Sequence, residues 1–183
     1  MMRAETESPE QPNGQPKTYR AARRAFIAAC EAAHVDTVAR LYPAQAPDGK
    51  PLFMDVAPLG PRTAAKAVLV LGYDAQGTDM LIALLRDVTL PPDTRLVLVH
   101  ALDPALFARV TEDSAWPPAM LAAVATEDLS KTLSLAVLPL GRSGEALKPV
   151  LQARLPKTHI VVLPSANDVE QARGAIADFF APD

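Results

Sequence analysis

Residues 66–113 decide the fold, because two short apolar runs flank a helical pattern there. The first run is Ala67-Val68-Leu69-Val70-Leu71, and the second is Arg95-Leu96-Val97-Leu98-Val99-His100. Between them, apolar residues recur on one side of a helix, at Met80, Leu81, Leu84, Leu85 and Val88. Continuous apolar runs of this length are typical of parallel strands buried on both faces of a sheet.

The rest of the chain adds a hairpin and further alternation of strands and helices. A helix is predicted over residues 18–34, followed by strands over 35–41 and 52–57 that form an antiparallel pair across a turn-rich loop. Later strands are predicted over 132–138 and 159–163, with helices over 105–110, 118–125 and 145–155 and a last helix near the end. The pattern predicts a three-layer αβα sandwich, with a mainly parallel sheet and an antiparallel edge hairpin.

Composition predicts one α/β domain over residues 18–183 and a disordered tail over 1–17, which is polar and rich in proline. The chain has 183 residues, of which 49% are hydrophobic, and a net charge of -3. This acidic balance favours neither nucleic acid nor an anionic membrane. No run approaches the roughly 20 apolar residues of a spanning helix. The single cysteine, Cys30, is expected in the core and suits a cytoplasmic location.

Polar residues follow the two central strands, where open α/β sheets bind their ligands. The candidate cleft consists of Asp74, Gln76, His100, Asp103, Glu112 and Asp113. A catalytic zinc usually takes three protein ligands and a water. The three histidines of the chain show no local metal-binding spacing, so neither a metal nor a cofactor is predicted. The alternative is a rearranged metal or acid–base site built from Asp74, His100 and either Glu112 or Asp113.

Several motifs together resemble one family. Tyr19, Arg23 and Phe26 fit the spacing Y-x-x-A-R-x-x-F. The segments Asp55-Val56-Ala57-Pro58-Leu59-Gly60-Pro61 and Val97-Leu98-Val99-His100-Ala101-Leu102-Asp103-Pro104 follow it. Over about residues 19–114 the chain resembles bacterial proteins of unknown function related to zinc carboxypeptidases and to succinylglutamate desuccinylase/aspartoacylase.

Compared with that family, the chain lacks the residues expected to bind zinc and the substrate carboxylate. In that family the turn after the first central strand reads G-T-H-G-x-E-G, and its His and Glu bind zinc. Here Asp74 stands at the His position, and Gln76 or Gly77 replaces the Glu. The Asn-Arg pair expected to hold a substrate carboxylate is absent from the segment that follows Thr111-Glu112-Asp113-Ser114.

These departures predict a protein that is not an enzyme: a degenerate hydrolase-like scaffold acting as a protein-binding or accessory subunit. Its partner would be another protein or a second copy. The binding surface would be the former cleft or an apolar strip of Trp116, Met120, Leu121 and Val124. The alternative is a small metal-dependent or acid–base hydrolase of acylated amino acids or peptides with a rearranged site.

Overall fold

The computed structural model describes residues 18–108, 118–126, 129, 133–138, 142–164 and 168–181. Within these residues the helices are α1 (Tyr19–Ala32), α2 (Ala75–Asp87), α3 (Pro104–Phe107), α4 (Pro118–Ala125), α5 (Arg142–Arg154) and α6 (Val169–Phe180). The strands are β1 (Val38–Gln45), β2 (Pro51–Leu59), β3 (Lys66–Leu71), β4 (Thr94–His100), β5 (Leu133–Leu138) and β6 (Thr158–Val162). No helix in this part of the chain is long and apolar enough to cross a membrane.

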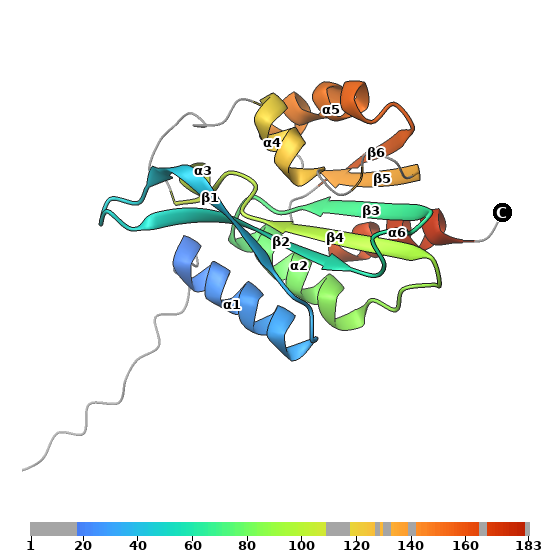
Figure 1. The fold of residues 1–183 in the computed structure, drawn as a ribbon, viewed down its shortest axis with the longest axis horizontal. Helices are drawn as coiled ribbons and strands as arrows, with labels where there is room; N and C mark the ends of the chain where they lie inside the picture. The colour runs from blue at the N-terminus through green and yellow to red at the C-terminus, as the bar shows by residue number, and fades with distance from the viewer. Residues whose placement is uncertain are drawn as a thin grey trace, which may run out of the picture.

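The strands form one sheet in the order β1-β2-β4-β3-β5-β6. Strands β4, β3, β5 and β6 are parallel, whereas β1 and β2 are antiparallel to each other and β2 is antiparallel to β4. Helices α1, α2 and α6 cover one face, and α4 and α5 cover the other (Figure 1). The prediction of a three-layer αβα sandwich with an antiparallel edge is therefore confirmed.

The two apolar runs are neighbouring parallel strands at the centre of the sheet. Val68 pairs with Leu96 and Leu71 pairs with Val99 in the register of β3 and β4. Every residue of β4 is buried. Alternate side chains of these strands enter the two separate apolar clusters on either face of the sheet. Burial on both faces explains why the runs contain no regular polar alternation.

The edge hairpin differs from its prediction. Strand β1 starts and ends later than expected and runs to Gln45, inside the segment predicted to be a loop. Tyr42 in that segment is buried, and the pairing with β2 resumes at Gln45 opposite Pro51 after an irregularity. Pro43 is tolerated because β1 is an edge strand, where one missing N–H disturbs no second ladder.

Two other local predictions have clear outcomes. Helix α5 begins at Arg142, so the tight turn predicted over residues 141–144 is wrong for residues 142–144, and Ser143 lies inside the first helical turn. Thr18 caps α1 as predicted, accepting a hydrogen bond from the backbone N–H of Ala21 at 3.3 Å.

Cys30 is fully buried in the core, and burial raises the pKa of its thiol to about 11. A thiol with this pKa is a poor nucleophile at neutral pH.

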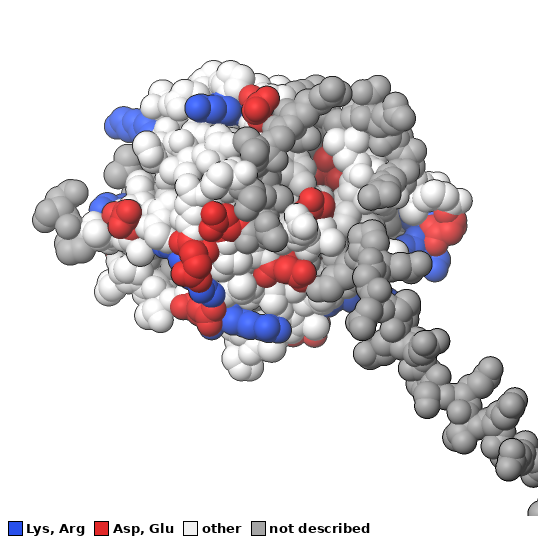
Figure 2. All heavy atoms as spheres, turned by 180° about the vertical axis from the view of Figure 1, so that it is seen from behind, with Lys and Arg blue, Asp and Glu red and all other residues white. Residues whose placement is uncertain are grey.

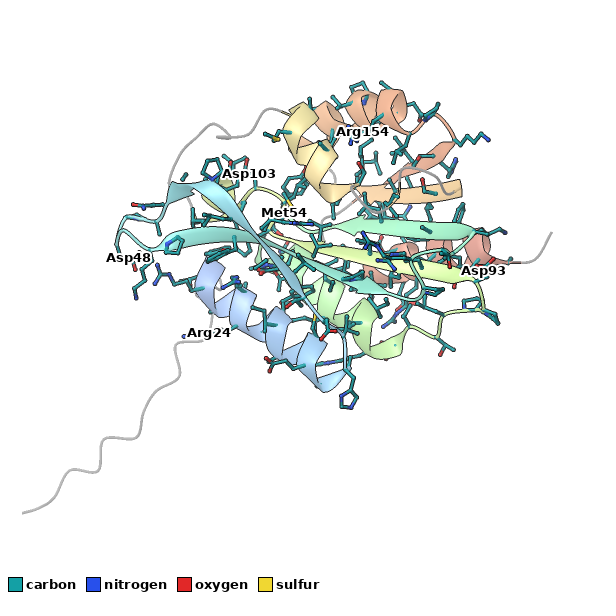
Figure 3. The ribbon with its side chains drawn as sticks, viewed as in Figure 1. Arg24, Asp48, Met54, Asp93, Asp103 and Arg154 are labelled. Carbon is teal, nitrogen blue, oxygen red and sulfur yellow. The ribbon has the colours of Figure 1, made fainter. Side chains whose placement is uncertain are left out.

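Positive and negative side chains are mixed on the face of the molecule that Figure 2 shows. Figure 2 shows acidic and basic side chains close together on the face opposite to the view of Figure 1. Arg24 points away from α1, whereas Asp103 lies beside the sheet where β4 leads into α3 (Figure 3). The predicted tail over residues 1–17 lies outside the described residues, as do Glu112, Asp113 and Trp116.

Candidate active site at the ends of the central strands

The turn after β3 is built around the cap of α2. Asp74 Oδ1 accepts a hydrogen bond from the backbone N–H of Gly77 at 2.8 Å, and the Asp74 carbonyl accepts one from Thr78 Oγ1 at 2.8 Å. Gly72 lies so close to α2 that an added Cβ would stand 2.9 Å from Leu81 Cδ1 and 3.3 Å from the carbonyl carbon of Gly77. The turn thus packs tightly, and its carboxylate is occupied in capping the helix.

The turn after β4 is joined to the turn after β3. The backbone N–H of Leu102 donates to the Gly72 carbonyl at 3.0 Å, and Ala101 adopts a positive φ of 52°. A non-glycine residue in this region of backbone space is strained, and such strain occurs often at functional sites. Asp103 then caps α3, with Oδ1 accepting from the Leu106 N–H at 3.2 Å.

His100 ends β4 and is fully buried among aromatic rings. It stacks on Phe26 with ring centroids 5.0 Å apart and an interplanar angle of 15°. Tyr19 stacks at 6.3 Å, and Phe107 of α3 lies at 5.9 Å in a tilted arrangement. Neither ring nitrogen of His100 makes a hydrogen bond to a described residue. Aromatic side chains of two helices, α1 and α3, therefore enclose an imidazole whose nitrogens are not committed to a hydrogen bond with a described residue.

Asp55 of β2 lies opposite His100 in the antiparallel pairing and is also fully buried. Its carboxylate accepts two hydrogen bonds from Arg23 of α1, from Nε at 2.8 Å and from Nη2 at 2.8 Å. Asp55 Oδ2 also lies 3.5 Å from His100 Nδ1, at the outer limit of hydrogen-bond length. Arg23 is 26% exposed, so the row Arg23–Asp55–His100 runs from the surface into the core.

The surroundings set the charge of each group in this row. Burial alone raises the pKa of Asp55, but the neighbouring His100 and Arg23 lower it by more, so the net pKa lies below the ordinary value. Burial lowers the pKa of His100, and the opposing effect of Asp55 is smaller. The hydrogen bond to Asp55 raises the pKa of Arg23. At neutral pH the row therefore contains a guanidinium, a carboxylate and a neutral imidazole.

The motif residues of the sequence converge in this buried row. Tyr19, Arg23 and Phe26 of the first motif surround Asp55 of the second and His100 of the third. Asp55 and Arg23 belong to the sequence motifs, but the cleft predicted from the sequence does not include them. The pattern that could have selected Asp55 is a lone carboxylate inside the otherwise apolar strand over residues 52–57.

The predicted cleft residues differ in burial and in their partners. Asp74 and Gln76 are exposed, whereas His100 and Asp103 are buried. Glu112 and Asp113 lie outside the described residues. The structure brings His100 together with Asp55, whereas the carboxylate of Asp74 caps α2.

The same fold occurs in enzymes of known structure. The crystal structure of the Bacteroides thetaiotaomicron glutaminyl cyclase bound to N-acetylhistamine superposes with a TM-score of 0.54 at 8% identity, covering 92% of this chain and 91% of that one. A leucine aminopeptidase precursor from the same organism gives 0.53 at 10% identity, with the same coverage. The Porphyromonas gingivalis glutaminyl cyclase gives 0.51 at 9% identity, covering 85% and 80%. The chain therefore shares the α/β fold of these enzymes.

Within this fold class the chain belongs to a family described as protein of unknown function (DUF2817), which matches residues 16–114. No curated protein matches the sequence. The narrower relation to succinylglutamate desuccinylase/aspartoacylase stays a prediction. The prediction that the protein is not an enzyme is contradicted, because the solved proteins that share its fold are a set of enzymes.

Zinc, which the family resemblance of the sequence implies, does not fit the described residues. No group of three or more His, Cys, Asp and Glu side chains among them is arranged to hold a metal ion. Asp74, at the family's His position, is occupied by the N–H of Gly77, and Gln76 offers a neutral amide, which is a poor zinc ligand. No step of the chemistry below is therefore assigned to a metal.

The expected binding partner, whether another protein or a second copy, stays a prediction. Met120 of the apolar strip is 48% exposed. Trp116 lies outside the described residues.

Proposed function

We propose that the protein is a small acid–base hydrolase of acylated amino acids or peptides, with His100 and Asp55 as its reactive pair. The observation that carries the proposal is the arrangement of these two side chains. A neutral imidazole lies beside a buried carboxylate that Arg23 keeps ionised, at the carboxyl end of a central strand. That end of an open α/β sheet is the usual place for a reacting ligand.

The fold supports the choice of substrate class to test first. Enzymes that share it are named glutaminyl cyclase and leucine aminopeptidase, and both names refer to aminoacyl groups. Because their sequence identity to this chain is low, these enzymes support a common fold only. Acylated amino acids or peptides as substrates are part of the proposal.

The proposed chemistry uses His100 as a general base and then as a general acid. Asp55 orients the ring through Nδ1, so that Nε2 takes a proton from a water molecule. The water oxygen forms a bond to the acyl carbon, and the C–N bond of the substrate breaks. The leaving amine receives the proton from Nε2. A separation of 3.5 Å between Nδ1 and Asp55 is compatible with this role, since catalytic hydrogen bonds are often long before substrate binds.

Access to His100 requires a local movement in this proposal. The ring is fully buried, and the half-buried Phe107 lies against it from α3, a helix of four residues. Short elements with few buried contacts open more readily than central strands. Displacement of Phe107 would uncover the imidazole without disturbing the sheet.

The test is hydrolysis of a panel of N-acylated amino acids and short peptides by the wild type, His100→Gln and a matched control, His159→Gln. His159 is exposed on β6. A positioned general base contributes about 100-fold or more, so His100→Gln should lose at least that factor in kcat/KM while His159→Gln loses none. Circular dichroism and thermal melting must show that His100→Gln is folded. Wild type without activity on the whole panel, or a folded His100→Gln with full activity, overturns the proposal.

A further inference from the structure

A second pair of polar side chains lies where the turns after β3 and β4 meet. Gly72 is held between these turns, because its N–H donates to the Val99 carbonyl at 2.9 Å and its carbonyl accepts from the Leu102 N–H at 3.0 Å. Tyr73 is the residue after Gly72, and Asp103 is the residue after Leu102. The backbone therefore brings Tyr73 and Asp103 near each other at the carboxyl end of the sheet, where the charge of Asp103 acts on Tyr73.

Each of these side chains has a buried polar atom without a partner among the described residues. They are the hydroxyl of Tyr73 and Oδ2 of Asp103. Asp103 is only 1% exposed, and its other oxygen is occupied by the cap of α3. Burial, together with the charge of Asp103, raises the pKa of Tyr73, so its hydroxyl keeps its proton and remains a donor. Unpartnered buried groups of this kind are costly and call for an explanation.

One unpartnered donor and one unpartnered acceptor near each other match the complementary pair of a secondary amide. We infer that Tyr73 and Asp103 bind the amide group of a ligand, with the amide N–H donating to Asp103 Oδ2 and the amide carbonyl accepting from the Tyr73 hydroxyl. Identifying this ligand as the acylated substrate rests on the proposed function. An ester lacks the N–H and cannot satisfy Asp103, so the pair should select amides over esters.

The test compares two probes of the same shape, N-benzoylglycine and its ester counterpart O-benzoylglycolic acid. Their binding is followed by NMR chemical-shift titration of the wild type, Tyr73→Phe, Asp103→Asn and the control Asp74→Asn. Asp74→Asn is matched because Asp74 also caps a helix through Oδ1 but is exposed. The same spectra report whether either probe is hydrolysed.

The wild type should bind the amide at least about tenfold more tightly than the ester, as expected for a hydrogen bond to a charged group. Asp103→Asn should lose this preference, and Tyr73→Phe should weaken both probes by about fivefold, because both carry the carbonyl. Asp74→Asn should behave as the wild type. Equal affinity for amide and ester in the wild type overturns the inference. The inference is also overturned if neither probe binds and an experimental density map shows only a water between Tyr73 and Asp103.

Binding and turnover separate the two proposals. Selective binding of the amide without hydrolysis would leave this inference standing while the proposed function fails. If Tyr73→Phe and Asp103→Asn hydrolyse the substrate as the wild type does, and binding shows no preference for the amide, this inference fails while the proposed function stands.

Discussion

Asp55 and Asp74 are both carboxylates near the centre of the fold, and the structure gives them opposite roles. Asp55 is fully buried and shared between Arg23 and His100. Asp74 is exposed and accepts a hydrogen bond from the backbone N–H of Gly77. By the family resemblance Asp74 stands where a zinc-binding His would be, yet Asp55 is the carboxylate that lies against a buried imidazole. The comparison teaches that burial and partners, rather than place in a motif, decide what a carboxylate does.

The largest expected effect is the loss of Asp55. Asp55→Ala leaves Arg23 and His100 without their shared partner and should lower the free energy of unfolding by about 3 kcal/mol, as for a broken buried ion pair. Asp74→Ala removes only a helix cap and should cost about 1 kcal/mol. Urea denaturation of both variants measures the difference. Equal losses would show that the two carboxylates are energetically alike.

The turn that holds Asp74 should instead be sensitive to volume. Gly72→Ala places a Cβ against Leu81 and the backbone of Gly77, and overpacking of this kind should cost about 2 kcal/mol. Gly49→Ala is not a suitable control because Gly49 has a positive φ. Gly174→Ala serves instead, since an added Cβ there would meet nothing within 4 Å beyond its chain neighbours and the backbone of its own helix. Thermal melting of both variants checks this, and a neutral Gly72→Ala would contradict the tight packing of the turn.

Acidification should weaken the buried row Arg23–Asp55–His100 in two steps. The pKa of His100 is lowered in the folded state, so its contribution to stability is full above the unfolded value near 6.5 and is lost as the pH falls below it. The slope can reach about 1.4 kcal/mol per pH unit for one proton. The pKa of Asp55 is also lowered, and its contribution is lost further down, below its unfolded value near 3.8. Denaturation curves from pH 7.5 to 5 should show the first loss in the wild type and not in His100→Gln.

The smallest expected effect concerns the attachment of α1 to the hairpin. The Tyr19 hydroxyl donates to the Phe53 carbonyl at 2.9 Å and accepts from the Phe53 N–H at 2.8 Å. Tyr19→Phe keeps the ring against His100 but removes both hydrogen bonds, so it should cost about 1 kcal/mol. Tyr42→Phe, which changes a buried tyrosine within the hairpin itself, provides a comparison. A Tyr19→Phe variant as stable as the wild type would show that α1 is held by packing and by Arg23.

Much of the fold could be predicted because local patterns and burial agree. The runs over residues 67–71 and 95–100 are apolar on both faces, and only a central parallel strand satisfies that pattern. The loop predicted over residues 42–50 was partly wrong because Pro43 and Pro47 indicate a break. An edge strand tolerates a proline that an inner strand would not.

The candidate site was predictable only in part. His100 and Asp103 were selected because they follow a central strand, a rule of topology that local sequence can apply. Asp55 and Arg23 were missed as site residues, because their pairing joins β2 to α1 across 32 positions of the chain. Periodicity describes one element at a time and contains no information on which elements meet.

The sequence by itself determined the layers of this protein, since the spacing of apolar residues dictates which face of each element is buried. Only the tertiary structure decided the charges at its centre. An imidazole stays neutral and a carboxylate stays ionised because burial and an arginine from a distant helix act on them together, and that environment exists only once β2, β4 and α1 have packed.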